Sequence, residues 1–168
     1  MLGVLHPAFL ERPVKTLAQP RVVAEIRERL THLTPHSSRR WGRMSVHAMV
    51  CHLTDVFRMA IGEQKVQRVD GLLHRTVVKW VALYAPLQWP GGRFPTSPEL
   101  DQAETLGATA PADFTADLQR LVRMLDRLTA RQRDFAWAAH PLFGPMSDAA
   151  WLRWGYLHMD HHLRQFGV

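Results

Sequence analysis

The chain has 168 residues, of which 46% are hydrophobic, and a formal net charge of +6 with one cysteine, Cys51. This length and composition predict a single globular domain over residues 1–168. One cysteine excludes an internal disulfide framework and a cysteine-based zinc finger, and it favours a reducing compartment. Because no signal peptide or long uncharged apolar stretch is present, we expect a cytoplasmic protein with no membrane partner.

The basic net charge raises the question of nucleic-acid binding. The basic residues are spread along the chain, and the only dense cluster is Arg39, Arg40 and Arg43. No nucleic-acid motif accompanies this cluster, and aromatic residues do not alternate with the basic ones as they do in a stacking platform. We therefore expect a solvated basic surface and no nucleic-acid partner.

Helical periodicity and capping residues predict an all-α fold with four core helices and one shorter helix. Serine or proline begins several of these helices and glycine follows two of them, as in many helix termini. A long proline-rich loop from Ala85 to Asp113 is expected either to act as a binding loop or lid or to pack as a surface strap. The predicted helices cover residues 20–30, 45–61, 71–83, 113 or 115 to 128, and 147–167.

The last predicted helix carries the clearest chemical signal. On a helical wheel, Arg153, Asp160 and Arg164 fall in one narrow polar sector, and nearly all other positions are apolar, aromatic or histidine. His158 and His162 lie opposite that sector and point inward. Two imidazoles at i and i+4 have Cβ atoms about 5–6 Å apart, which suits one shared metal ion. The competing interpretation is a pair of core histidines, each hydrogen-bonded to a neighbour.

Two further observations limit this interpretation. The second predicted helix carries His47 and His52 on opposite flanks of its apolar stripe, so the wheel does not choose between them. The zinc-protease pattern H-E-x-x-H is absent, because Met159 follows His158 and Asp160 points to the other side of the helix. A metalloprotease is therefore disfavoured.

Four motifs, taken together, resemble the DinB/YfiT-like superfamily, within which they are most similar to a bacterial branch of largely uncharacterised members. This resemblance covers nearly the whole chain and implies an up-down-down-up four-helix bundle, often found as a homodimer. The motifs are R-R-W-G-R-M-S-V-H-A-M-V-C-H-L-T-D (Arg39–Asp55), W-P-G-G-R-F-P-T-S-P-E-L-D (Trp89–Asp101), H-P-L-F-G-P-M-S (His140–Ser147) and H-M-D-H-H-L-R-Q-F-G (His158–Gly167).

The resemblance also implies a metal site with three histidine ligands. Its metal would be divalent, with Zn and Ni as the first choices and Fe, Co and Mn as alternatives. The family ending H-H-R-G-Q reads H-H-L-R-Q here, so the family's arginine has no match in place. The implied metal ligands are His52, His158 and His162. The candidate contacts to a cofactor or substrate are His161, Gln165 and Asp55.

Three imidazoles leave a fourth position open for water or substrate, as in catalytic metal sites. Characterised relatives imply a thiol-dependent S-transferase or isomerase that uses mycothiol, bacillithiol or glutathione with a small electrophile. The alternative is a non-enzymatic stress-response or binding module of the same fold. A metal-dependent hydrolase would need a carboxylate as general base, and the inward side of the last helix offers none. Cys51 fits a small buried residue better than a nucleophile.

Overall fold

The structure is a computed structural model that describes residues 14–69, 71–85, 88–89 and 108–168. Within these residues the regular structure is helical, with one isolated β-bridge between His140 and Gly144 and no strand. The prediction of an all-α fold is confirmed. The elements are α1 (Pro20–Thr31), α2 (Val46–Ala60), the π-helix η1 (His74–Val78), α3 (Lys79–Tyr84), α4 (Phe114–Thr129) and α5 (Asp148–Gln165).

Serine and aspartate side chains cap the first turns of three helices. The Ser45 hydroxyl accepts a hydrogen bond from the Ala48 N–H at the start of α2, and the Asp113 carboxylate accepts one from the Ala116 N–H at the start of α4. Ser147 caps α5 in the same way. Each bond satisfies one of the backbone donors that a helix leaves unpaired at its first turn. The predicted starts of these three helices are confirmed.

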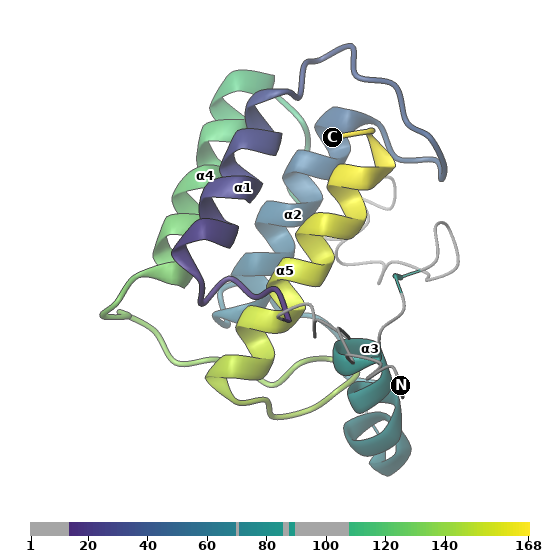
Figure 1. Ribbon diagram of the computed structural model, residues 1–168, viewed down its shortest axis with the longest axis vertical. Coiled ribbons are helices and arrows are strands. Elements are labelled where there is room, and N and C mark those ends of the chain that lie inside the picture. The colour runs from purple at the N-terminus through teal and green to yellow at the C-terminus, as the bar shows by residue number, and fades with distance from the viewer. Residues whose placement is uncertain (1–13, 70, 86–87, 90–107) are drawn as a thin grey trace, which may run out of the picture.

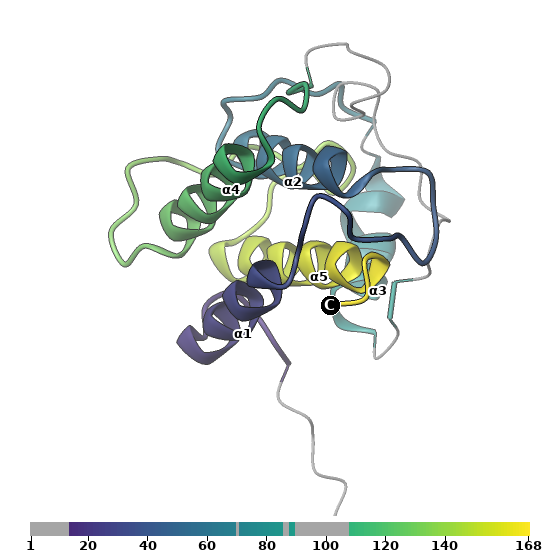
Figure 2. The ribbon, with the colours of Figure 1, turned by 90° about the horizontal axis from the view of Figure 1, so that it is seen from above.

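The long helices lie alongside one another, with α3 set at one end of them (Figure 1). Seen from above, α2 and α4 form one layer and α1 and α5 the other (Figure 2). The core between the layers is apolar, and it contains large fully buried side chains such as Phe57 of α2, Leu121 of α4 and Trp151 of α5. This packing holds the inward face of α5 against α2.

The predicted helix over residues 71–83 is present, but it differs from an ordinary core helix. Its middle part, His74–Val78, is π-helical, and α3 continues from it to Tyr84. Only one inward residue, Leu83, is fully buried. Two backbone carbonyls on its inner side accept side-chain hydrogen bonds, Leu83 O from Arg153 Nε at 2.8 Å and Ala82 O from Trp89 Nε1 at 2.8 Å. The inner side of α3 is thereby fixed to α5 and to Trp89.

Most of the predicted proline-rich loop, including nearly all of the Trp89–Asp101 motif, lies outside the described residues. Among the helices that are described, none is both long and apolar enough to span a membrane.

Candidate metal site

Three histidines from two helices meet between α2 and α5. His52 comes from α2, and His158 and His162 come from successive turns of α5. Each offers one ring nitrogen, and these three nitrogens all lie within 4.8 Å of one another. The Nε2 atoms of His52 and His158 are 3.1 Å apart. The ring centroid of His162 lies 4.9 Å from that of His52 and 5.0 Å from that of His158.

The three-histidine cluster exists because α5 turns its i and i+4 histidines toward α2, as the wheel predicted. The structure also decides between the two histidines of α2. His52 faces α5, whereas His47 faces α4, where its Nε2 lies 2.8 Å from Oδ2 of Asp117. The set His52, His158 and His162 implied by the resemblance is thus brought together. His47 lies outside it.

Burial keeps the α5 histidines neutral. Removal from water lowers the pKa of His158 well below its usual value, and the neighbouring His162 and His52 lower it further. Burial, followed by the proximity of His52, likewise lowers the pKa of His162 well below its usual value. A neutral imidazole has a free nitrogen lone pair, which is the form that binds metals. These rings are therefore in the ligand-competent protonation state at neutral pH.

Gln165 orients His162. Its Nε2 donates to the backbone carbonyl of Trp41 at 2.9 Å, so its Oε1 is the atom that faces Nδ1 of His162, also at 2.9 Å. An amide oxygen only accepts, so Nδ1 of His162 must carry the proton. This tautomer leaves Nε2 of His162 as the nitrogen with a free lone pair. A partner that fixes the second ring nitrogen is the usual support of a metal-binding histidine.

Gly42 makes room for this contact. Its φ is +77°, a left-handed conformation that suits glycine, and a Cβ built there would lie 2.6 Å from Nε2 of Gln165. Trp41 and Gly42 lie in the irregular connector before α2, where no periodicity marks them. The sequence did not predict their role; the Trp-Gly pair next to the predicted helix start was the only available signal.

Tryptophans surround the cluster. The Trp154 ring lies 4.8 Å from that of His158, and the Trp89 ring lies 5.9 Å from it on edge. His161, predicted as a cofactor contact, lies beside the ligands, with its ring centroid 6.0 Å from that of Trp41 and 6.2 Å from that of Trp89. Burial lowers its pKa. Nδ1 of His158, Nδ1 of His161 and Nε1 of Trp41 are buried without a hydrogen-bond partner among the described residues. Unsatisfied buried polar atoms of this kind are unusual in a folded core. Those of His161 and Trp41 suit a ligand beside the cluster, whereas Nδ1 of His158 is the ring nitrogen that does not face His52.

Asp55, the third predicted cofactor contact, has a structural task. It is fully buried, its Oδ2 accepts the Thr109 N–H at 2.6 Å, and its Oδ1 accepts the Thr109 hydroxyl at 2.7 Å. Arg58 Nη1 donates to Oδ1 at 3.2 Å. These bonds tie the segment before α4 to α2. These hydrogen bonds are enough to explain why the Asp55 carboxylate is buried. A contact between Asp55 and a cofactor stays a prediction.

A second group of possible metal ligands, His47, Cys51 and Asp117, lies between α2 and α4. Asp117 Oδ2 accepts from the Ala112 N–H at 3.2 Å, and Arg120 donates to its other oxygen at 2.6 Å. Burial, with the nearby Asp117 second, raises the pKa of the Cys51 thiol to about 12. Cys51 is therefore a buried neutral thiol, which agrees with the sequence interpretation. The cluster is held together by its own hydrogen bonds.

One family model matches residues 7–167, nearly the whole chain, and is described as "Protein of unknown function (DUF1569)". The chain belongs to this family. No curated protein and no solved structure matched the chain. Since the description of DUF1569 includes no activity, the chemistry of the site has to be inferred from its own residues.

Proposed function

We propose that this DUF1569 chain is a divalent-metal-binding protein whose ligands are His52, His158 and His162. The observation that carries the proposal is the convergence of three imidazoles from two helices, with their ligand nitrogens within 4.8 Å. The lowered pKa values of His158 and His162 support it, because both rings are neutral where a cation would bind.

The separation of the nitrogens suits a metal. Two nitrogen ligands at the usual Zn–N distance of about 2.0–2.1 Å lie about 3.3 Å apart at the tetrahedral angle and about 2.9 Å apart at a right angle. The 3.1 Å between the Nε2 atoms of His52 and His158 falls between these values. Three imidazoles fit Zn or Ni, with Fe, Co and Mn as further candidates. A divalent ion bound here would lower the pKa of a thiol or water molecule that reaches its open position.

We further propose a DinB-like up-down-down-up four-helix bundle and a thiol-dependent S-transferase or isomerase activity. Support for the bundle comes from α1, α2, α4 and α5 lying alongside one another in two layers (Figures 1 and 2). Support for the activity comes from the sequence motifs and from the indole and imidazole groups beside the ligands. In this reading His161 and Trp41 contact the bound thiol through their unsatisfied nitrogens, and Trp89 provides an apolar wall.

The second candidate is a non-enzymatic binding module with a structural metal or none. It is favoured by the close aromatic packing of Trp154 and Trp89 on His158, which limits access to that ring. The two candidates differ in whether the fourth metal position exchanges.

The test is the metal content of full-length protein purified without a histidine tag, for wild type, His52→Ala, His158→Ala and His162→Ala. We expect about one ion per chain in wild type and its loss in all three variants. His47→Ala is the matched control, because His47 lies on the same helix as His52 and faces α4; this variant should retain the ion. A wild type that neither carries an ion nor takes one up on reconstitution would refute the metal site.

A second measurement separates the two candidates. Cobalt-substituted protein is titrated with glutathione, mycothiol and bacillithiol, and its visible spectrum is followed. A saturable spectral change supports the transferase reading, since it requires an exchangeable position next to the metal. An unchanged spectrum with full metal occupancy supports the binding module.

A further inference from the structure

One side of η1 and α3 is exposed and apolar. Six of its side chains face solvent, with exposed fractions that include 82% for Leu72, 57% for Val77 and 62% for Trp80. Together they expose roughly 700 Å², whereas the largest apolar patch on a typical monomer covers about 300–600 Å². Patches of this size mark surfaces that bind another surface. We call this one the outer face; it consists of Leu72, Leu73, Val77, Trp80, Val81 and Tyr84.

The other side of the same helix is packed on the protein, so the helix is held with its outer face in solvent. Leu83 is fully buried, and its carbonyl accepts from Nε of Arg153 at 2.8 Å. The first part of the helix, η1, is π-helical, a rare conformation that is frequently found at functional sites. Figure 1 shows α3 projecting at one end of the long helices, where a flat surface can reach it.

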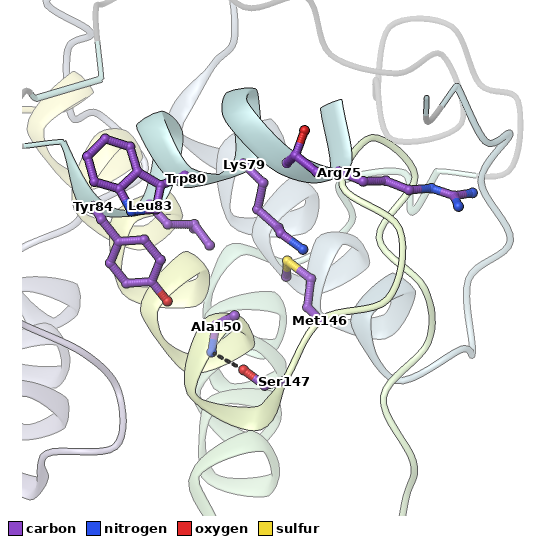
Figure 3. Close-up of a pocket in the computed structure, with 9 residues that line it drawn as sticks. Arg75, Lys79, Trp80, Leu83, Tyr84, Met146, Ser147 and Ala150 are labelled. Carbon is purple, nitrogen blue, oxygen red and sulfur yellow. Dashed lines mark hydrogen bonds between the residues drawn. The ribbon is translucent and has the colours of Figure 1, made fainter. Parts of the chain in front are cut away.

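Basic side chains lie next to the outer face. A groove of about 430 Å³ separates this helix from the start of α5. Trp80 and Tyr84 of the outer face line one end of the groove, and Arg75 lines the other end (Figure 3). Lys79 extends into the groove between them (Figure 3). Apolar, aromatic and cationic groups therefore meet along one edge of the helix.

The charge of this region is positive. As far as the structure describes them, residues 64–85 carry no acidic side chain and two further basic ones, Lys65 and Arg68. On the α5 side of the groove, the carboxylate of Asp148 is engaged elsewhere, because its oxygens accept from Arg133 Nη1 and from Trp137 Nε1. The groove and the outer face thus suit a partner that is apolar and negatively charged.

We propose that the outer face binds the surface of a membrane that contains anionic phospholipids. Its aliphatic side chains enter the boundary between headgroups and acyl chains, as the apolar side of a surface helix does. The rings of Trp80 and Tyr84 lie at the headgroup level, where such rings are enriched. Arg75 and Lys79 attract the lipid phosphates. The rest of the chain stays in water and takes the place of the polar side of a surface helix.

This proposal is independent of the metal site and needs no spanning helix. The expectation of no membrane partner came from the absence of a long apolar stretch, which a helix that lies on a membrane does not need. A protein partner would also cover the outer face. Pairing this face with a like-charged one, however, would bring the cations beside it together, whereas anionic lipid phosphates neutralise them.

The test is cosedimentation of the full-length, tag-free chain with vesicles of phosphatidylglycerol and phosphatidylcholine in equal parts, and with vesicles of phosphatidylcholine alone. We expect binding to the mixed vesicles that is at least about tenfold tighter and that weakens as salt is raised. Val77→Glu should weaken this binding at least about tenfold, because it places a charge at the centre of the outer face. Lys79→Gln should weaken it about fivefold and leave binding to phosphatidylcholine unchanged.

Two variants of α4 are the matched controls. Arg123→Gln removes the same charge as Lys79→Gln, and Gln119→Glu adds the same charge as Val77→Glu, both at exposed positions. Each should bind the mixed vesicles within about twofold of wild type, because exposed charges far from the contact are screened. Val77 and Trp80 are exposed in the folded chain, so Val77→Glu and Trp80→Glu should keep the far-UV circular dichroism of wild type.

Three results would overturn the proposal. The first is a wild type that does not sediment with the mixed vesicles even at low salt. The second is binding that Val77→Glu and Trp80→Glu leave as tight as Gln119→Glu does, which would mean adsorption through the net charge of +6 alone. The third is a wild type that binds no vesicles but forms a dimer that Val77→Glu dissociates, which would assign the outer face to a second copy of the chain.

Discussion

Replacing Gln165 tests whether the hydrogen bond to His162 supports metal binding. Gln165→Met keeps the approximate volume of the side chain but removes both hydrogen bonds, to Nδ1 of His162 and to the Trp41 carbonyl. The buried Nδ1–H of His162 then has lost its acceptor, and the ring can turn or change tautomer. Loss of the hydrogen-bond partner of a metal-ligating histidine lowers metal affinity about 10- to 100-fold, or about 1.4–2.7 kcal/mol. The same substitution should also lower the free energy of unfolding of the metal-free protein, measured with a chelator present, by about 1–3 kcal/mol.

Gln165→Glu provides the matched comparison. Its carboxylate still accepts from Nδ1 of His162 but can no longer donate to the Trp41 carbonyl. We therefore expect metal affinity within about threefold of wild type, together with a loss of stability similar to that of Gln165→Met. Affinity is measured by competition with a chromophoric chelator, and stability by urea unfolding with EDTA. If Gln165→Met binds metal as tightly as wild type, Gln165 does not orient His162 and the tautomer assignment loses its functional meaning.

Three further predictions follow from single contacts. Gly42→Ala should lower metal affinity by displacing Gln165 and should cost about 1–2 kcal/mol through its left-handed φ, both measured as above; an unchanged affinity would separate Gly42 from the site. Burial lowers the pKa of His140 to about 3, whereas in the unfolded chain its pKa is about 6.5. Between these two values the unfolded chain binds a proton at His140 and the folded chain does not. This group should therefore cost about 2 kcal/mol of stability between pH 7 and pH 5, and His140→Asn should flatten urea-measured stability over that range by the same amount. Asp55→Ala should lose about 2–4 kcal/mol of stability by releasing Thr109 while retaining its metal, and loss of the metal would instead place Asp55 in the site.

The ends of the helices were predictable because their signals are local. Ser45, Asp113 and Ser147 each act on a backbone N–H three residues along the chain, so no tertiary information is needed. Gly62 and Gly167 follow α2 and α5 with φ of +80° and +81°, the left-handed conformation expected after a helix. These contacts join residues that are close together in the sequence, so they can be predicted without knowing how the helices pack.

The candidate site was predictable only in part. The pairing of His158 with His162 is set by helix geometry and appears on a wheel. Helix geometry does not determine whether His47 or His52 faces α5, because the wheel gives only their angle to the apolar stripe. Asp117 lies 70 residues from His47 along the chain, and it is the helix packing that brings the two together. Only tertiary structure could assign His47 to α4.

The exposed apolar side of the helix over residues 72–84 is the reverse case. Its residues predicted a helix correctly, and an apolar stripe normally indicates the side that packs on the core. In the structure Leu72, Val77 and Trp80 point outward, and the less conspicuous Leu83 provides the inner contact. Sequence periodicity therefore identifies a helix and its apolar positions, but it cannot say which of those positions pack on the core of the chain.

The polar sector of α5 holds the helix to its neighbours. Arg153 donates to two backbone carbonyls, one in α3 at 2.8 Å and one before α1 at 2.6 Å. Asp160 accepts from Arg29 of α1 at 2.9 Å. The wheel predicted this sector as the side away from the core, and its bonds anchor that side to neighbouring elements. Since the other side of α5 is packed on α2, the helix is held around its circumference. His158 and His162 then have little freedom to rearrange, which would lower the entropic cost of the proposed metal binding.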